Sequence, residues 1–116
     1  MSLTIYHNPR CSKSRQTLGL IEAAGQTADV ILYLETSPSV DEIKILLKKL
    51  GFDDPRELMR KGEAIYKELG LKDEQNPDIL IKSMAEHPKL IERPIVVKGA
   101  KAVLGRPPEQ VQALLP

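Results

Sequence analysis

The chain has 116 residues, a length that suits a single domain with one hydrophobic core. Its 17 Lys and Arg nearly balance its 16 Asp and Glu, and the net charge of +1 gives no reason to expect binding to nucleic acid or to a membrane. Because no apolar run is long enough for a membrane span or a signal peptide, we expect a cytoplasmic protein.

The first third of the chain predicts a strand, a helix and a second strand. Residues 3–6 are rich in β-formers, and Leu18, Ile21 and Ala24 in the stretch 12–24 are spaced to line one face of a helix. The apolar run 30–34 is typical of a buried strand. Such a βαβ unit implies two parallel strands with a right-handed crossover.

Residues 39–87 predict a block of short helices without a strand. Ser39 and Glu42 form a capping-box pattern, Gly70 ends a short helix, and Asn76 precedes another. The block is too continuous with its neighbours to count as a separate domain. We therefore expect one domain over 1–116 with a helical insertion at about 39–87.

The last part of the chain predicts two strands and a helix. Residues 95–97 form an apolar run, 99–100 a turn, and 101–104 a return strand, while Pro107 and Pro108 begin a final helix with Val111, Leu114 and Leu115 turned inward. The fold class is α/β, with a mixed sheet in the order β-α-β, helical insertion, β-β-α.

Cys11 is the only cysteine, so the chain cannot form an internal disulfide or a zinc site with several cysteine ligands, and we expect no metal site. A lone cysteine is most often a small buried hydrophobe. Here Arg10, Lys13 and Arg15 surround it, and it stands where the first helix begins. Cations and the free N–H groups of a first helical turn favour a thiolate and a bound anion.

Two residues near Cys11 carry open alternatives. His7 could lower the pKa of the thiol as a cation, take its proton as a neutral base, or hold the Asn8-Pro9 turn in shape. Ser14 occupies the position of the second cysteine of a dithiol motif, and its hydroxyl could donate to a thiolate or an oxyanion. The loop of a tyrosine phosphatase is excluded, because it requires arginine where Thr17 stands.

Three arginines are candidates for oxyanion binding. Arg93 and Arg106 lie at strand ends and each precedes a proline, while Arg60 closes a short helix. A planar guanidinium group binds a tetrahedral oxyanion through paired hydrogen bonds.

Several ordered blocks of this sequence resemble the glutaredoxin-dependent arsenate reductases. The similarity runs over nearly the whole chain, which is far more specific than one short motif. The blocks that carry it are 7–17, 31–34, 58–61, 87–97 and 105–107.

The resemblance implies a thioredoxin-like fold in which a cis Pro94 faces the cysteine. It implies Cys11 as nucleophile toward arsenate or a similar oxyanion, with Arg60, Arg93 and Arg106 around it, and arsenite as product. Glutathione is then a co-substrate, glutaredoxin a partner, and no cofactor is bound. We expect a monomer. The alternatives are a glutathione-dependent thiol oxidoreductase of unknown substrate and a non-catalytic transcription regulator with the same fold, although Ser14 removes the sensing disulfide of such regulators.

Overall fold

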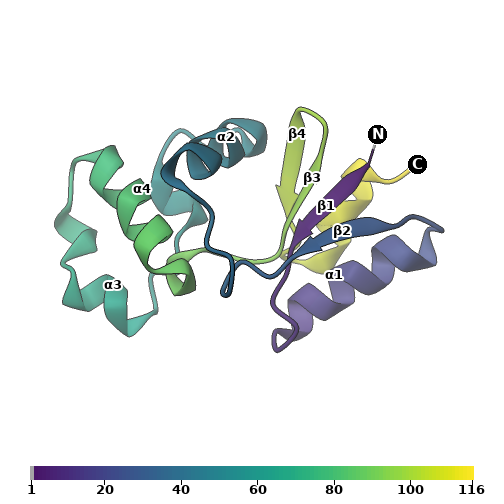
Figure 1. The fold of residues 1–116 in the computed structure, drawn as a ribbon, viewed down its shortest axis with the longest axis horizontal. Coiled ribbons are helices and arrows are strands. Elements are labelled where there is room, and N and C mark those ends of the chain that lie inside the picture. The colour runs from purple at the N-terminus through teal and green to yellow at the C-terminus, as the bar shows by residue number, and fades with distance from the viewer. Residues whose placement is uncertain (1) are drawn as a thin grey trace. The chain divides into compact units, whose positions relative to one another are not determined.

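A computed structural model describes residues 2–116, which fold into two compact units (Figure 1). The sheet unit combines Met1–Thr36 with Arg93–Pro116, and the helical unit is Ser37–Glu92. No helix within residues 2–116 is both long and apolar enough to cross a membrane.

The sheet unit contains a four-stranded mixed sheet in the order β2-β1-β3-β4. β1 (Leu3–Tyr6) pairs in parallel with β2 (Ala28–Ile31) and antiparallel with β3 (Ile95–Lys98), which pairs antiparallel with β4 (Lys101–Leu104). The predicted α/β class with a β-α-β, insertion, β-β-α order is confirmed.

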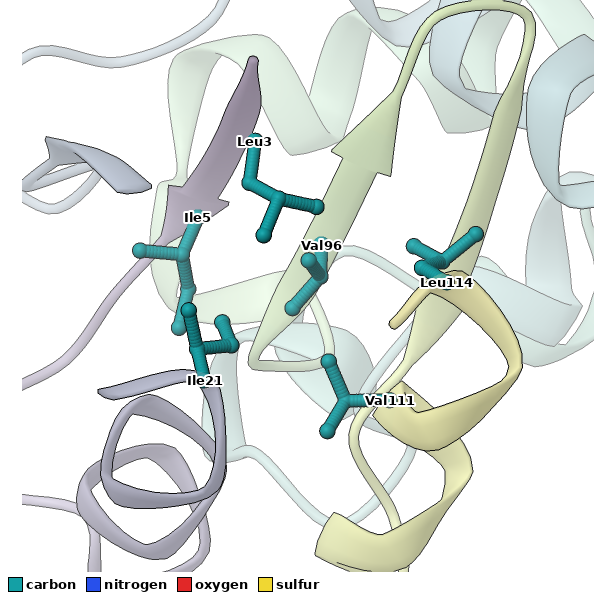
Figure 2. Packing of buried hydrophobic residues seen from close by; sticks show 6 residues of the cluster. All are labelled: Leu3, Ile5, Ile21, Val96, Val111 and Leu114. Carbon is teal, nitrogen blue, oxygen red and sulfur yellow. The ribbon is translucent and has the colours of Figure 1, made fainter. Parts of the chain in front are cut away.

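The core of the sheet unit lies on one face of the sheet, against α1 (Ser12–Ala23) and the 3₁₀ helix η4 (Pro108–Leu114). Side chains of alternate residues in a strand point to the same face, so Leu3 and Ile5 meet Val96 there. Full burial of one such aliphatic side chain contributes roughly 1.5–3 kcal/mol. Figure 2 shows the cluster: Leu3, Ile5, Ile21, Val96, Val111 and Leu114.

The prediction of a buried second strand over 30–34 was wrong in both bounds and burial. β2 ends at Ile31, and the chain then turns, with the N–H groups of Glu35 and Thr36 donating to the Leu32 carbonyl. β2 is an edge strand with a single neighbour, so Val30 is 47% exposed. An apolar run reports hydrophobicity but not whether a second strand covers it.

The two helices of the sheet unit also differ from the prediction. α1 buries Ser14, Thr17 and Ile21, while Leu18 is half-buried and Ala24 exposed. The last helix does turn Val111 and Leu114 inward, but it is 3₁₀, with hydrogen bonds between residues three apart, and Leu115 is half-buried.

The helical unit has a core of its own, built from α2 (Val40–Leu50), α3 (Ala64–Glu68), α4 (Pro77–Glu86) and the 3₁₀ turns η1 (Pro55–Leu58), η2 (Leu71–Asp73) and η3 (Pro88–Leu90). The predicted caps are present: Ser39 Oγ accepts from the Glu42 N–H at 3.1 Å, and Asn76 caps α4. Gly70 ends α3 with a φ of +64°. The fully buried side chains include Ile43, Leu58, Leu71, Leu80, Met84, Leu90 and Ile91.

Candidate functional site

The loop between β1 and α1 is fixed by hydrogen bonds to its own backbone. The Cys11 N–H donates to the Asn8 carbonyl at 3.0 Å, and the Arg10 N–H donates to Asn8 Oδ1 at 3.0 Å. Arg15 Nη1 reaches back from α1 and donates to the Pro9 carbonyl at 2.8 Å. These contacts hold the loop so that Cys11 enters the helix at one defined position.

Cys11 is the N-cap residue of α1, with an extended backbone at φ −95° and ψ 122°. Its side chain is buried, with 9% of its surface exposed. The thiol makes no capping hydrogen bond, so the N–H groups of the first turn remain available for a negatively charged sulfur. The predicted position at the start of a helix is thus the observed one.

The surroundings of Cys11 lower the pKa of its thiol. Burial by itself would raise this pKa, since a thiolate loses hydration. The Ser14 N–H, the charge of Arg93, the Lys13 N–H and a hydrogen bond from Arg93 act in the opposite direction, and the net pKa lies below the ordinary thiol value. The site therefore favours the nucleophilic form of sulfur.

The sheet brings Arg93 and Arg106 to the same end as Cys11. Tyr6, at the end of β1, lies opposite Ile95, which pairs with Leu104, so the segments after β1, before β3 and after β4 leave the sheet together. Arg93 is half-buried, and Arg106 is exposed with its Nη1 donating to the Arg93 carbonyl at 3.4 Å. Two guanidinium groups thus belong to the end of the sheet that carries the cysteine.

Two prolines adjoin these arginines through cis peptide bonds. The Arg93–Pro94 bond is cis, as the resemblance implied, and the Arg106–Pro107 bond is cis as well.

Arg60 belongs to the helical unit, where it lies between two carboxylates. Its Nη1 is 2.6 Å from Glu63 Oε1, and its Nε is 3.7 Å from Glu92 Oε1. The Arg60 N–H donates to the Leu90 carbonyl at 2.7 Å. The structure establishes these partners, and the part of Arg60 in an oxyanion site stays a prediction.

His7 and Ser14 form a buried pair beneath the loop. His7 Nδ1 lies 2.6 Å from Ser14 Oγ, which also accepts the Asn8 N–H at 3.0 Å. Burial, followed by the charge of Arg15, lowers the pKa of His7, which favours the neutral imidazole. Of the alternatives for His7, this geometry supports the one that holds the turn.

The hydroxyl and the backbone N–H of Ser14 have different neighbours. Its hydroxyl is engaged with His7 and Asn8, and the group that acts on Cys11 is the Ser14 backbone N–H. Donation from the Ser14 hydroxyl to a thiolate or an oxyanion stays a prediction.

Three residues of the site escaped the sequence analysis. From the sequence, Arg15 was considered only as a cation near Cys11, yet its side chain holds the Pro9 carbonyl. Thr17 is fully buried and donates to the Lys13 carbonyl at 2.8 Å and to the Gly105 carbonyl at 3.4 Å. A Cβ on Gly105 would overlap Thr17 Oγ1 and lie 2.8 Å from Pro94 Cγ, so only glycine fits without a shift of these side chains. Thr17 lies three positions after Ser14, so the two polar residues share one face of the helix, and this spacing was the signal in the sequence that could have identified Thr17.

The described residues contain no group of three or more His, Cys, Asp and Glu side chains that could hold a metal ion. A mixed sheet, a single cysteine at the start of the first helix and a cis-proline before β3 together define a thioredoxin-like protein. The ArsC family profile matches residues 6–114, and this chain belongs to the ArsC family.

Relatives and solved structures agree with this assignment. The chain is 55% identical to the uncharacterized protein YfgD of Escherichia coli K12, over 92% of this chain and 91% of YfgD. It is 50% identical to an arsenate reductase of Haemophilus influenzae, over 99% of this chain and all of that protein (100%). The structure of an arsenate reductase from Vibrio cholerae superimposes with a TM-score of 0.96 at 59% identity, covering 99% of this chain and 98% of that one.

Proposed function

We propose that this protein reduces arsenate to arsenite, with Cys11 as the nucleophile and with glutathione and glutaredoxin as electron donors. The observation that carries the proposal is a thiol of lowered pKa, held at a helix N-terminus beside the Arg93 guanidinium. The arsenate reductases named among its relatives support arsenate as the substrate.

The first step forms a bond between sulfur and arsenic. The Cys11 thiolate attacks arsenic, and one hydroxyl group of the arsenate takes a proton and leaves as water. Arsenic stays pentavalent. Backbone N–H groups and guanidinium groups that are already in place stabilise the charge on the arsenate oxygens without reorganising.

The later steps supply two electrons. Glutathione attacks the arsenic of the adduct, and a second water leaves. A glutaredoxin thiolate then attacks the glutathione sulfur, and a mixed disulfide forms between glutaredoxin and glutathione. The bond between the glutathione sulfur and arsenic breaks, and its electron pair stays on arsenic, which becomes trivalent. Hydrolysis of the bond to Cys11 releases arsenite. An external thiol is required, because Cys11 is the only cysteine of the chain.

Arg93, Arg106 and Arg60 are proposed to bind the oxyanion. Arg93 has the strongest support, since it already interacts with the Cys11 sulfur. Arg106 follows from its place beside Arg93. Arg60 is included on the resemblance alone.

The test is arsenate-dependent oxidation of NADPH in the presence of glutathione, glutaredoxin and glutathione reductase. We expect turnover by the wild type and none by Cys11→Ser, with the free energy of unfolding of the two proteins compared by urea titration. Omission of arsenate or of glutaredoxin provides the controls. Arsenate reduction by the Cys11→Ser variant would contradict the mechanism.

The same thiol, without an internal resolving cysteine, also suits removal of glutathione from mixed disulfides. Activity on a glutathionylated peptide, with none on arsenate, would select this second function.

A further inference from the structure

A cavity of 360 Å³ borders the loop that leads to Cys11. One wall is the loop itself, residues 7–10, and the other is the turn after β2, with Leu32, Leu34 and Glu35. This volume lies within the range of about 300–1,000 Å³ that is typical of small-ligand sites. Arg10, which lines the cavity, directly precedes Cys11 in the chain, and consecutive Cα atoms are about 3.8 Å apart.

One cation, one anion and two leucines are among the residues that line the cavity. Arg10 and Glu35 are both exposed, and neither forms an ion pair with another described residue. Leu34 is 41% exposed, although it is a large apolar side chain. Uncommitted charges of both signs around exposed apolar surface suit a small zwitterion better than a simple oxyanion.

We infer that this cavity, which we call the loop cavity (residues 7–10 with Leu32, Leu34 and Glu35), binds the peptide part of glutathione. The inference rests on the proposed function, which requires glutathione to reach an adduct on Cys11. Glutathione carries two carboxylates and one ammonium group at its ends, with the thiol between them. Arg10 takes a carboxylate, and Glu35 takes the γ-glutamyl ammonium group.

The two ends of the cavity are held by contacts that do not involve these charges. The His7 N–H donates to the Ile31 carbonyl at 2.8 Å, which ties the loop to the end of β2. The Glu35 N–H donates to the Leu32 carbonyl at 2.9 Å, which shapes the turn. Neutral substitutions of Arg10 and Glu35 therefore leave the walls in place, and their effects report on the ligand.

The experiment follows thiol–disulfide exchange at Cys11, which needs no arsenate. The Cys11 thiolate attacks one sulfur of glutathione disulfide, a mixed disulfide forms on Cys11, and one glutathione thiolate leaves. Mass spectrometry of the intact protein gives the rate constant. The same measurement with hydroxyethyl disulfide, which lacks the charged peptide ends, reports the intrinsic reactivity of the thiol.

We expect Arg10→Ala and Glu35→Gln each to slow the reaction with glutathione disulfide by roughly fivefold. Their rates with hydroxyethyl disulfide should stay unchanged, because neither side chain is among the groups that shift the pKa of Cys11. Glu35→Gln is the sharper test, because glutathione is an anion and long-range electrostatics alone would make the loss of a carboxylate accelerate the reaction. Lys101→Ala and Glu109→Gln, which change exposed charges elsewhere in the sheet unit, should behave as the wild type.

Several results would overturn the inference. An equal loss with both disulfides would mean that the variants act on the thiol itself. An unchanged glutathione rate would mean that the cavity is not used. If the two variants slow only the reaction with glutathione disulfide but the wild type does not reduce arsenate, the proposed function fails and the glutathione site stands.

Discussion

The reactivity of Cys11 depends on a small number of groups whose contributions can be separated. Burial opposes ionisation, and the Ser14 N–H, the Lys13 N–H and Arg93 overcome it. The backbone donors come with the helix and cannot be removed by substitution. Arg93 is the one side chain among them, so it controls how much thiolate is present at neutral pH.

The first prediction concerns the pH dependence of alkylation. In the wild type, the rate with iodoacetamide should rise with pH around a midpoint below the ordinary thiol value, because the pKa of Cys11 is lowered. Arg93→Gln should move this midpoint upward, since a cation and a hydrogen bond to the thiolate are lost. Arg106→Gln is the matched control, and it should move the midpoint less. The same midpoint in the wild type and in Arg93→Gln would contradict this account.

The second prediction concerns His7 and stability. The folded protein holds His7 at a lowered pKa, so below the ordinary value of about 6.5 the unfolded chain binds more protons than the folded one. Stability should therefore fall as the pH decreases through this range and through the lower folded value. Urea unfolding at a series of pH values checks it, and in His7→Asn this component of the pH dependence should be absent. A wild type and variant with parallel pH profiles would show that His7 titrates normally.

At the scale of elements, the site depends on how closely α1 approaches the loop after β4. Thr17, in the middle of α1, donates to the Gly105 carbonyl, and the Gly105 N–H donates to the Pro94 carbonyl at 2.9 Å. Gly105 thus joins the first helix to the segment that carries Arg93 and Pro94. The absence of a side chain at Gly105 therefore allows α1 and the segment with Arg93 and Pro94 to lie this close together.

The third prediction is that Gly105→Ala destabilises the protein by about 1–3 kcal/mol, since a methyl group would overlap Thr17 and Pro94. Gly19→Ala is the matched control, because no atom lies within 4 Å of its Cβ position, and alanine in a helix is favoured by about 0.5–1 kcal/mol. Urea titration of both variants measures the two effects. Equal effects would show that the packing at Gly105 can relax.

At the scale of the whole molecule, the candidate residues are divided between the two units. Cys11, Arg93 and Arg106 belong to the sheet unit, and Arg60 belongs to the helical unit with its partners Glu63 and Glu92. Arginine between two carboxylates is held in position, but an oxyanion that binds it must compete with them.

The fourth prediction tests whether the helical unit contributes to catalysis. Arg60→Ala should lower kcat/KM for arsenate by at least roughly tenfold, the loss typical of one charge-assisted contact. The rate of Cys11 alkylation should not change. Lys82→Ala removes an exposed cation from the same unit and should have no effect on either rate. A fully active Arg60→Ala would confine the site to the sheet unit.

Features that depend only on residues close together in the sequence were predicted correctly. These include β1, the Ser39 and Asn76 caps, the left-handed Gly70, and Cys11 at the start of a helix. Each depends on neighbours a few residues away, so hydrogen-bonding groups and apolar spacing in the sequence are sufficient signals.

Tertiary structure decided what depends on partners far along the chain. The edge position of β2 exposes Val30, and the Ser14 hydroxyl is engaged with His7 and with the Asn8 N–H. The close approach of Gly105 to Thr17 joins residues 88 positions apart. Burial and hydrogen-bond partners at these positions are set by groups that meet only in the folded chain. A local pattern of residues does not contain that information.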